Sequence, residues 1–311
     1  MRLTRRKQAS RRMVAWADGV SYLDLMRELR RYDIGDIQVT VVSDGEVRLD
    51  AGAVFGLVPR VMWEPVVGLE NLDDQHRITM GLNCLLIRSG DDVLLVETGM
   101  GNKLVGSMRE KVFPGEYGML MEDLLAAGVR ASDVTAVANT HLHADHCGWN
   151  TVKDYDRLRP TFPNARYYID AGEYAAAMNP NERTKATYLR ENFEPLEKAG
   201  QLDLIEGETE IVPGVRFIPT PGHTADHAAL VISSKGSTGY YLGDMVQHAA
   251  HIERVPWISA FDVLPLVSLE TKKSIAERAI RENALLMCTH APYPGAGRLT
   301  ESGGRRTYTP E

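Results

Sequence analysis

Apolar residues in this chain fall in many short stretches, some of them alternating with polar residues, and this pattern predicts β-strands. The predicted strands are 37–41, 46–49, 82–87, 93–96, 134–139, 166–169, 203–206, 215–218, 227–233, 239–242 and 285–288. Asp44 and Gly45 separate the first two strands and predict a hairpin turn, and Gly90 lies in a similar turn between the next two. The pattern therefore predicts a protein built mainly on β-hairpins.

Helical spacing of apolar residues predicts fewer elements, most of them short. The predicted helices are 21–32, 120–128, 171–178, 182–198 and 269–283. Hairpins followed by helices occur twice along the chain, which predicts the α+β class, with two sheets packed together and helices outside them. No repeat or Gly/Ser/Pro-rich linker divides the chain, so we expect a basic N-terminal arm and helix at 1–33 and a single domain at 34–311.

Composition excludes several classes of protein. Of the 311 residues 44% are hydrophobic and 25% are charged, which is typical of a soluble globular protein and excludes disorder over most of the chain. The net charge of −7 argues against nucleic acid as a partner. No apolar run reaches the ~18–20 residues that a membrane-spanning helix needs, so we expect no membrane partner.

The N-terminus and the cysteines bear on the cellular compartment. Basic residues are frequent in 1–12, but the apolar stretch that follows at 13–17 is shorter than the ~7–15 residues of a signal peptide. Cys84, Cys147 and Cys288 are too few, and odd in number, for a disulfide framework. We therefore expect a protein of the reducing cytoplasm.

Histidines are concentrated directly after the predicted strand 134–139. His141 and His143 are two positions apart on an extended strand end, so they point the same way and can hold one cation. Asp145 and His146 then begin a turn or helix that aims them at a second cation. Imidazole and carboxylate are the ligands that Zn²⁺ and similar ions prefer. This spacing predicts a site for two cations, and a polar solvent-facing loop is the alternative interpretation.

Further ligands are expected from other strand ends, because a rigid sheet positions the groups that its loops carry. His223 lies in a Gly/Pro turn after 215–218, Asp244 follows Gly243 after 239–242, and His290 follows 285–288. The remaining histidines are not expected to be ligands: His76 is expected at the surface, His227 in the core or supporting a ligand, and His248 and His251 are candidates to line the pocket. Cys147 is not expected to be a ligand.

These residues resemble the ordered ligand signature of the metallo-β-lactamase-fold hydrolases. The matching motifs are His141-Leu142-His143-Ala144-Asp145-His146, Pro221-Gly222-His223-Thr224, Gly243-Asp244 and His290. Within that superfamily the chain is most similar to the branch of acyl-homoserine-lactone lactonases and methyl-parathion-type organophosphorus hydrolases. This narrower resemblance rests on 50–56, 243–250, 261–262 and 290–297.

The resemblance implies a four-layer αββα sandwich with a metal site at one edge between the two sheets. The implied ligands are His141, His143 and His223 for one metal ion, Asp145, His146 and His290 for the second, and Asp244 as a bridge. Two divalent ions are expected, zinc by default, although the same donors accept manganese, cobalt or iron. The family usually has Asp-Thr-Gly where this chain has Glu97-Thr98-Gly99, so the longer acid is expected to alter how the motif loop is held.

These expectations favour a dinuclear metal-dependent hydrolase in which a metal-bridging hydroxide attacks a lactone or related carboxylic ester. A quorum-quenching-type lactonase is the first hypothesis. Asp145 and Asp244 are the expected catalytic residues, because Asp145 can shuttle a proton to the leaving group and Asp244 holds both ions. The chain has no Gly-x-Ser-x-Gly motif that would indicate a serine nucleophile instead.

Two other functions stay open. An organophosphorus triester or aryl ester hydrolase of the same fold uses the same chemistry, and the ligand set does not separate it from a lactonase. A mononuclear iron sulfur-dioxygenase-type redox enzyme belongs to another class, but it leaves Asp145 and His146 without a function.

The substrate is expected to be a small molecule with a hydrophobic acyl or aryl part, and a homodimer is left open. Its pocket is expected to be lined by Val54, Phe55, Leu57, Val58, Val61, Met62 and Trp63 on one side and by Trp257, Ile258 and Phe261 on the other. Burial of these residues in the core is the alternative.

Overall fold

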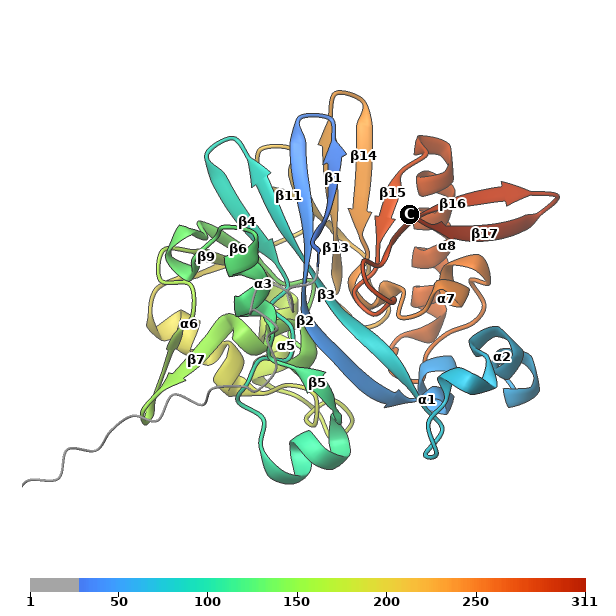
Figure 1. Cartoon of the computed structure of the whole chain (residues 1–311), viewed down its shortest axis with the longest axis horizontal. Helices are drawn as coiled ribbons and strands as arrows, with labels where there is room; N and C mark the ends of the chain where they lie inside the picture. The colour runs from blue at the N-terminus through green and yellow to red at the C-terminus, as the bar shows by residue number, and fades with distance from the viewer. Residues whose placement is uncertain (1–27) are drawn as a thin grey trace, which may run out of the picture.

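The computed structural model describes residues 28–311. Within this range two β-sheets pack face to face, and helices cover both outer faces, as Figure 1 shows. This is the αββα sandwich that the sequence predicts. Among the described residues no helix is both long and apolar enough to cross a membrane.

The first sheet contains eight strands of the described chain and runs in the order β1-β2-β3-β4-β6-β9-β10, with β5 paired to β2. Its strands are β1 (Arg30–Ile34), β2 (Ile37–Asp50), β3 (Arg77–Ser89), β4 (Asp92–Val96), β5 (Gly115–Tyr117), β6 (Ala136–Ala138), β9 (Arg166–Asp170) and β10 (Leu202–Ile205). The β3–β4 hairpin is confirmed, with its turn at Gly90. From β4 onward the pairing is parallel, so the carboxyl ends of β4, β6 and β9 lie at the same edge.

The second sheet contains seven strands of the described chain in the order β11 to β17. Its strands are β11 (Thr209–Val212), β12 (Val215–Pro219), β13 (Ala228–Ser234), β14 (Ser237–Tyr241), β15 (Leu285–Met287), β16 (Ala296–Ser302) and β17 (Arg305–Pro310). A separate hairpin joins β7 (Thr151–Asp154) to β8 (Arg157–Pro160). Here too one parallel pair, β14 with β15, sends two strands toward the same edge.

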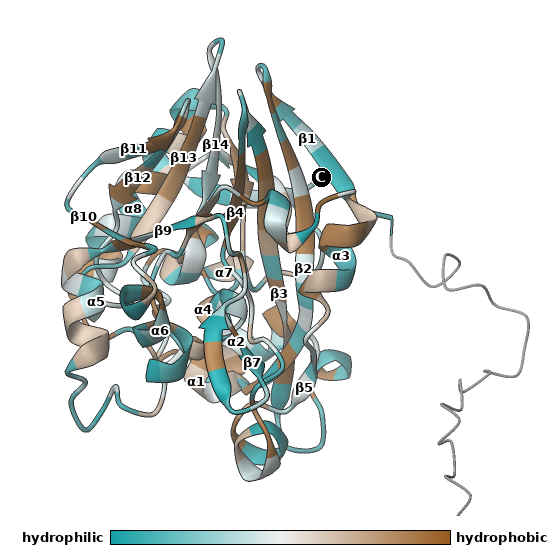
Figure 2. Cartoon of the chain, turned by 90° about the vertical axis from the view of Figure 1, so that its left-hand side faces the viewer, coloured by the Kyte–Doolittle hydropathy of each residue, from teal (hydrophilic) through white to brown (hydrophobic). Residues whose placement is uncertain are grey.

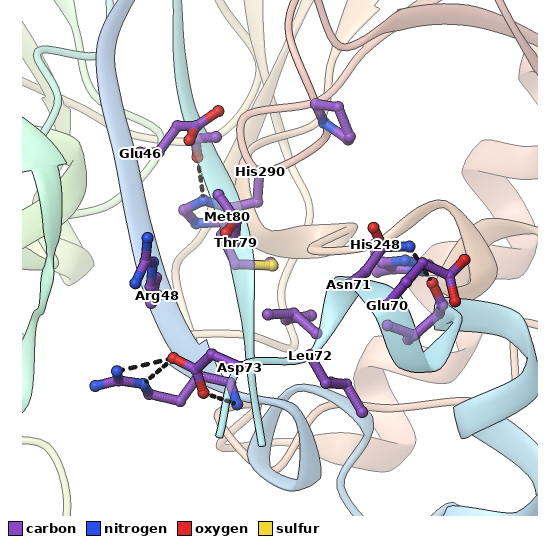
Figure 3. A pocket seen from close by; sticks show the side chains of 15 residues that line it. Glu46, Arg48, Glu70, Asn71, Leu72, Asp73, Thr79, Met80, His248 and His290 are labelled. Carbon is purple, nitrogen blue, oxygen red and sulfur yellow. Dashed lines mark hydrogen bonds and ion pairs between the residues drawn. The ribbon is translucent and has the colours of Figure 1, made fainter. Parts of the chain in front are cut away.

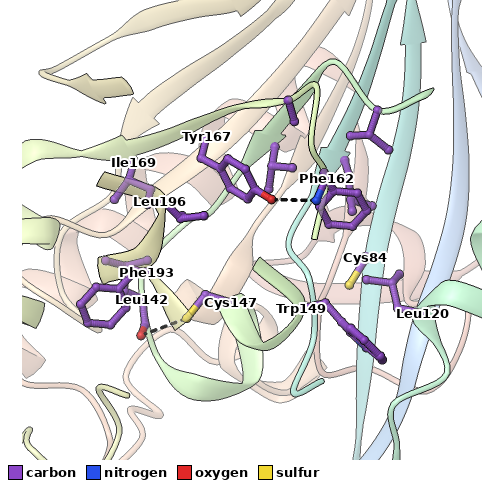
Figure 4. Packing of buried hydrophobic residues seen from close by; sticks show 14 of the residues in the cluster. Cys84, Leu120, Leu142, Cys147, Trp149, Phe162, Tyr167, Ile169, Phe193 and Leu196 are labelled. Atoms are coloured by element: carbon purple, nitrogen blue, oxygen red, sulfur yellow. Dashed lines mark hydrogen bonds between the residues drawn. The ribbon is translucent and has the colours of Figure 1, made fainter. Parts of the chain in front are cut away.

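Helices complete the outer layers. They are α1 (Ala51–Phe55), α2 (Arg60–Val67), α3 (Leu120–Ala126), α4 (Ala144–Cys147), α5 (Ala171–Met178), α6 (Glu194–Lys198), α7 (Ala249–Glu253) and α8 (Pro265–Glu282). Apolar residues of α3, α5 and α6 pack on the first sheet, and those of α7 and α8 pack on the second. Figure 4 shows Leu120 and Leu196, from two of these helices, among the side chains of the first outer layer.

The strands of the sandwich are apolar on both faces because both faces are covered. In β3, Leu85 and Ile87 point between the sheets, whereas Leu86 points outward under the helices. In β13, Leu230 likewise faces the other sheet and Val231 faces α8. The hydrophobic colour that runs along β12 and β13 in Figure 2 follows from this double burial.

The predicted hairpin turn at Asp44 and Gly45 is wrong. The chain continues through both residues as the single strand β2, and the pairing register with β3 shifts between Ser43 and Glu46, which marks a β-bulge. Asp44 is fully buried and accepts hydrogen bonds from the backbone N–H groups of Gly101 and Leu120. These distant partners fix the bulge, so an Asp-Gly pair does not reverse the chain here.

Two predicted helices also differ from the structure. Residues 182–198 are helical only in α6 and in one short 3₁₀ segment (Arg190–Asn192), because 182–187 form turns and Tyr188 pairs with His143 of the histidine motif. The predicted helix 21–32 cannot reach Tyr32, since Arg30–Ile34 is strand β1 of the first sheet. Residues 28 and 29 are not helical either, and the rest of that helix and of the predicted arm, 1–27, lies outside the described residues.

Candidate metal centre

The loops that carry the seven predicted ligands meet at one edge of the sandwich. His141 and His143 follow β6, and α4 begins immediately after His143, which puts Asp145 and His146 in its single turn. The loop between β12 and β13 supplies His223. Two further residues follow strands of the second sheet: Asp244 after β14 and His290 after β15. The rigid strand ends therefore bring together residues that are far apart in sequence.

Three histidines form the first cluster. The ring nitrogens of His141, His143 and His223 lie within 4.8 Å of one another, and all three side chains are buried. His223 Nε2 lies 3.1 Å from His143 Nδ1. Nitrogen atoms at this spacing can coordinate one common cation.

A second cluster lies beside the first. It contains Asp145, His146 and His290, whose donor atoms also lie within 4.8 Å of one another. Asp145 Oδ2 is 3.6 Å from His290 Nε2 and 3.7 Å from His146 Nε2. Two imidazoles and a carboxylate thus face one position.

Asp244 lies between the two clusters. Its Oδ2 atom is 3.3 Å from His223 Nε2, whereas its Oδ1 atom is 3.2 Å from His146 Nε2 and 2.9 Å from His290 Nε2. One carboxylate oxygen therefore faces each cluster, which is the geometry of a bridging ligand.

The donor atoms fit metal ions better than they fit hydrogen bonds with one another. His141 Nε2, both ring nitrogens of His146 and Asp244 Oδ1 are buried without a hydrogen-bond partner. Buried polar atoms without a partner are rare in native proteins, because each costs about 1–3 kcal/mol. A bound cation would give these atoms a partner, because it accepts their lone pairs. The residues therefore fit divalent metal ions.

The protonation states support the same conclusion. Burial, followed by the neighbouring imidazoles, holds the pKa values of His141 and His143 well below the usual range, so both rings are neutral donors. Burial opposes the ionisation of Asp244, yet His290 and His146 hold its pKa well below the usual range. Against the effect of burial, Asp244 in turn raises the pKa values of His146, His223 and His290, so a metal ion that binds these rings must displace their protons.

Hydrogen bonds orient the rings from outside. His290 Nδ1 lies 2.8 Å from the carbonyl oxygen of Gly81, which can only accept, so Nδ1 carries a proton and Nε2 faces the site. Asp262 Oδ1 lies 3.1 Å from His223 Nδ1 and fixes that ring in the same way. Ser268 Oγ donates to the other oxygen of Asp262 at 2.6 Å.

Glycine at position 243 lets Asp244 approach. Gly243 has φ +52°, and a Cβ there would lie 2.6 Å from His227 Nε2. That same His227 nitrogen accepts a hydrogen bond from the backbone N–H of Asp244 at 3.1 Å. Burial lowers the pKa of His227 to about 3, so its neutral ring is the acceptor that fixes this backbone. His227 is thus a supporting residue, as predicted.

Two buried acids hold the histidine motif. Glu97 Oε1 accepts a hydrogen bond from the backbone N–H of Thr140 at 2.9 Å, and its Oε2 accepts from Asn139 Nδ2 at 3.3 Å. Glu173 accepts from the backbone N–H of Leu142 at 2.9 Å and also binds the adjacent loop. The sequence drew attention to Glu97 but not to Glu173, which stands in an alanine-rich helix with no motif around it.

The other histidines and Cys147 make contacts outside the donor clusters, and neither His248 nor His251 lines the cavity that opens onto those clusters. His76 is exposed, and His251 is buried in contact with Phe55. His248 caps α7, where its Nδ1 accepts from a backbone N–H at 3.1 Å. Cys147 Sγ points away from the site toward the carbonyl of Leu142, the contact drawn in Figure 4, and to that of His143. All three cysteines are buried and free.

A cavity of about 270 Å³ opens onto the two clusters. It is lined by His143, Asp145, His223, Asp244, Gln247 and His290, by the apolar residues Leu49, Phe113, Ala260, Phe261 and Val263, and by Arg183, Thr184 and Thr187. Of the ten apolar residues expected to line the pocket, only Phe261 does so.

The predicted pocket wall is therefore largely wrong. Phe55 and Trp63 stack at 5.2 Å inside the core, where Val54 and Trp257 are also buried. Leu57 instead is fully exposed. An apolar run indicates burial, but it does not say which cavity the buried face lines.

His290 separates this cavity from a larger one. The second cavity has a volume of about 540 Å³ and is drawn in Figure 3. Its charged lining residues include Glu46, Arg48 and Asp73, and Arg77 within it forms an ion pair with Asp73 at 2.8 Å. The second cavity is thus more polar than the one that opens onto the clusters.

Comparison with known sequences agrees with this geometry. The family model described as the metallo-beta-lactamase superfamily matches residues 79–291. An N-acyl homoserine lactonase from a Bacillus species is 28% identical over 220 residues, which cover 67% of this chain and 80% of that protein. A probable metallo-hydrolase of Mycobacterium bovis is 26% identical over 243 residues, which cover 66% of this chain and 72% of that protein.

Solved structures agree as well. A probable metal-dependent hydrolase from Staphylococcus aureus superposes with a TM-score of 0.80 at 26% identity, covering 90% of this chain and 99% of that one. AidC, a dizinc quorum-quenching lactonase solved in complex with a product, superposes with a TM-score of 0.78 at 20% identity, covering 91% and 97%. The second likeness shows the fold alone. The chain belongs to the metallo-beta-lactamase superfamily and is a metal-dependent hydrolase of that fold.

Proposed function

We propose that this protein is a dinuclear metal-dependent hydrolase that opens lactones or cleaves related carboxylic esters. The observation that carries the proposal is the convergence of two donor clusters on adjacent positions, with one oxygen of Asp244 toward each. When bound, two divalent cations lower the pKa of a shared water and polarise the carbonyl under attack. Lactonases among the relatives and the structural neighbours support a lactone as the substrate.

In this proposal seven residues hold the metal ions, and one of them also transfers a proton. The proposed ligands are His141, His143 and His223 at one position, Asp145, His146 and His290 at the other, and Asp244 at both. Asp145 is the more exposed carboxylate, with 14% of its side chain accessible against 7% for Asp244. Because it lines the cavity, Asp145 is the group that carries a proton to the leaving oxygen.

The cavity favours a small substrate with an apolar part. Ligand pockets usually measure ~300–1,000 Å³, so a volume of about 270 Å³ suits a small molecule with a short side chain. Leu49, Phe113 and Val263 offer it an apolar surface, and residues of the donor clusters line the same cavity.

The proposal is tested by assaying the metal-loaded protein against a short-chain acyl-homoserine lactone, a simple lactone, a nitrophenyl ester and a phosphotriester. We expect a lactone to be hydrolysed fastest. Asp244→Ala is the matched variant, and it should lose metal together with about 100-fold or more of the activity. Faster cleavage of the phosphotriester would overturn the lactone assignment, and full activity in Asp244→Ala with two ions bound would overturn the proposed site.

A further inference from the structure

The cavity at the metal centre carries one charge that the proposed hydrolysis does not use. Arg183 is the only lysine or arginine that lines this cavity among residues 28–311. The carboxylates of the lining, Asp145 and Asp244, belong to the donor clusters. The hydroxyl-bearing Thr184 and Thr187 line the cavity beside Arg183 and make this part of the lining polar.

Arg183 is held across the cavity by its neighbours. Its Nη2 atom donates a hydrogen bond to the carbonyl of Ala260 at 2.6 Å, which joins two loops that both line the cavity. The Asn181 Oδ1 atom accepts from the backbone N–H groups of Arg183 at 2.9 Å and Thr184 at 3.2 Å, which fixes the turn. A guanidinium offers five N–H donors, and the bond to Ala260 uses one of them.

The charge of Arg183 has no acidic counterpart within the described part of the chain, where its one side-chain hydrogen bond goes to a backbone carbonyl. Arg77 in the neighbouring cavity differs, because it is paired with Asp73. A carboxylate entering the smaller cavity would supply the missing partner through charge-assisted, bidentate hydrogen bonds. A neutral carbonyl would match the geometry but not the charge.

We propose that Arg183 binds a carboxylate on the acyl side chain of the substrate, so that the enzyme prefers lactones whose short acyl group ends in a carboxylate. The inference rests on the proposed lactonase function and narrows its substrate class. With the scissile carbonyl at the metal centre, Phe113 and Phe261 contact the methylene groups of the acyl chain. The guanidinium meets the terminal carboxylate at the polar side of the cavity.

The test compares two lactones of matched shape, N-succinyl-homoserine lactone and N-isohexanoyl-homoserine lactone. The acyl chain of the first ends in a carboxylate, and that of the second ends in an isopropyl group of similar shape. The quantity measured is the ratio of their kcat/KM values in the metal-loaded wild type, in Arg183→Gln and in Lys185→Gln. Lys185 is an exposed cation two residues away that does not line the cavity, so it is the matched control for net charge.

We expect the wild type and Lys185→Gln to favour the succinyl substrate, and Arg183→Gln to lower that ratio about ten-fold, mainly through KM. The ratio is measured within each variant, so a loss of folded enzyme does not change it. If the protein hydrolyses lactones but Arg183→Gln leaves the ratio unchanged, the role of Arg183 is refuted and the proposed lactonase function is not. A wild type that hydrolyses neither lactone would refute the proposed function and this inference with it.

Discussion

Replacing Glu173 should loosen two loops of the metal centre at once. Its side chain is fully buried on α5. Oε1 accepts hydrogen bonds from the backbone N–H of Leu142 at 2.9 Å and from the hydroxyl of Tyr188 at 3.0 Å. Oε2 accepts from Thr224 Oγ1 at 2.7 Å. Leu142 lies inside the histidine motif, and Thr224 follows the histidine of the second loop, so one carboxylate fixes both.

The magnitude follows from the donors left behind. Glu173→Ala leaves three buried donors without an acceptor, at about 1–3 kcal/mol each, so with partial relaxation we expect a loss of about 3–5 kcal/mol in the free energy of unfolding. Glu173→Gln keeps one carbonyl oxygen for Leu142 and Tyr188, and the hydroxyl of Thr224 can turn to accept from the new amide. The glutamine variant should therefore lose only about 1 kcal/mol.

Metal affinity is the second quantity to measure, because a purely structural role would not change it selectively. Loss of an outer hydrogen bond typically weakens metal binding ~10–100-fold, which we expect for Glu173→Ala, with rescue in Glu173→Gln. Urea unfolding of the metal-free protein and competition with a chromophoric chelator measure the two effects. Glu122→Ala, which removes an exposed carboxylate on α3, is the control and should stay within ~0.5 kcal/mol. Wild-type metal affinity in Glu173→Ala would refute the reasoning.

Two further predictions concern residues beside the site. Burial raises the pKa of Asp44 from 3.8 to about 6, so its contribution to stability is greatest below about pH 4 and is lost as the pH rises to about 6. Urea unfolding should show the stability of the wild type relative to Asp44→Asn falling by up to ~3 kcal/mol over that interval, and a constant difference would contradict the assignment. Gly148→Ala should cost about 3 kcal/mol by urea unfolding, because its Cβ would lie 2.0 Å from the backbone of Met100. Gly90→Ala, with no atom within 4 Å, should cost less, and equal losses would contradict a steric cause.

Short apolar runs predicted most strands, because both faces of these strands are covered in the sandwich. Sequence patterns failed where distant residues decide the local conformation. An Asp-Gly pair occurs in the sequences of both turns and bulges. Here the bulge is fixed by the hydrogen bonds that Asp44 accepts from Gly101, Leu120 and Trp149, which are distant in sequence. Likewise 182–198 has helical composition, but the carbonyl of Thr187 accepts a hydrogen bond from the backbone N–H of Ala144, and Tyr188 forms a β-bridge with His143.

The candidate ligands were predictable for two reasons. They follow the ends of strands, and histidine and aspartate side chains are rarely buried there without a metal ion or another partner. The structure brings all seven together, and their roles as ligands are the subject of the proposal above. The surrounding shell was not predictable. Glu173 has no motif, and Arg183 and Phe113 reach the cavity from segments whose path depends on tertiary contacts. The charge and shape of the substrate pocket therefore could not be predicted from the sequence without the tertiary structure.

The most direct test of the central claim is a titration of metal-free protein with zinc, in which lactone hydrolysis is followed against the equivalents bound. Two adjacent donor clusters bridged by Asp244 predict that activity is absent without metal and rises until two ions are bound per chain. Full activity in the metal-free protein, or a plateau at one bound ion, would contradict a dinuclear centre.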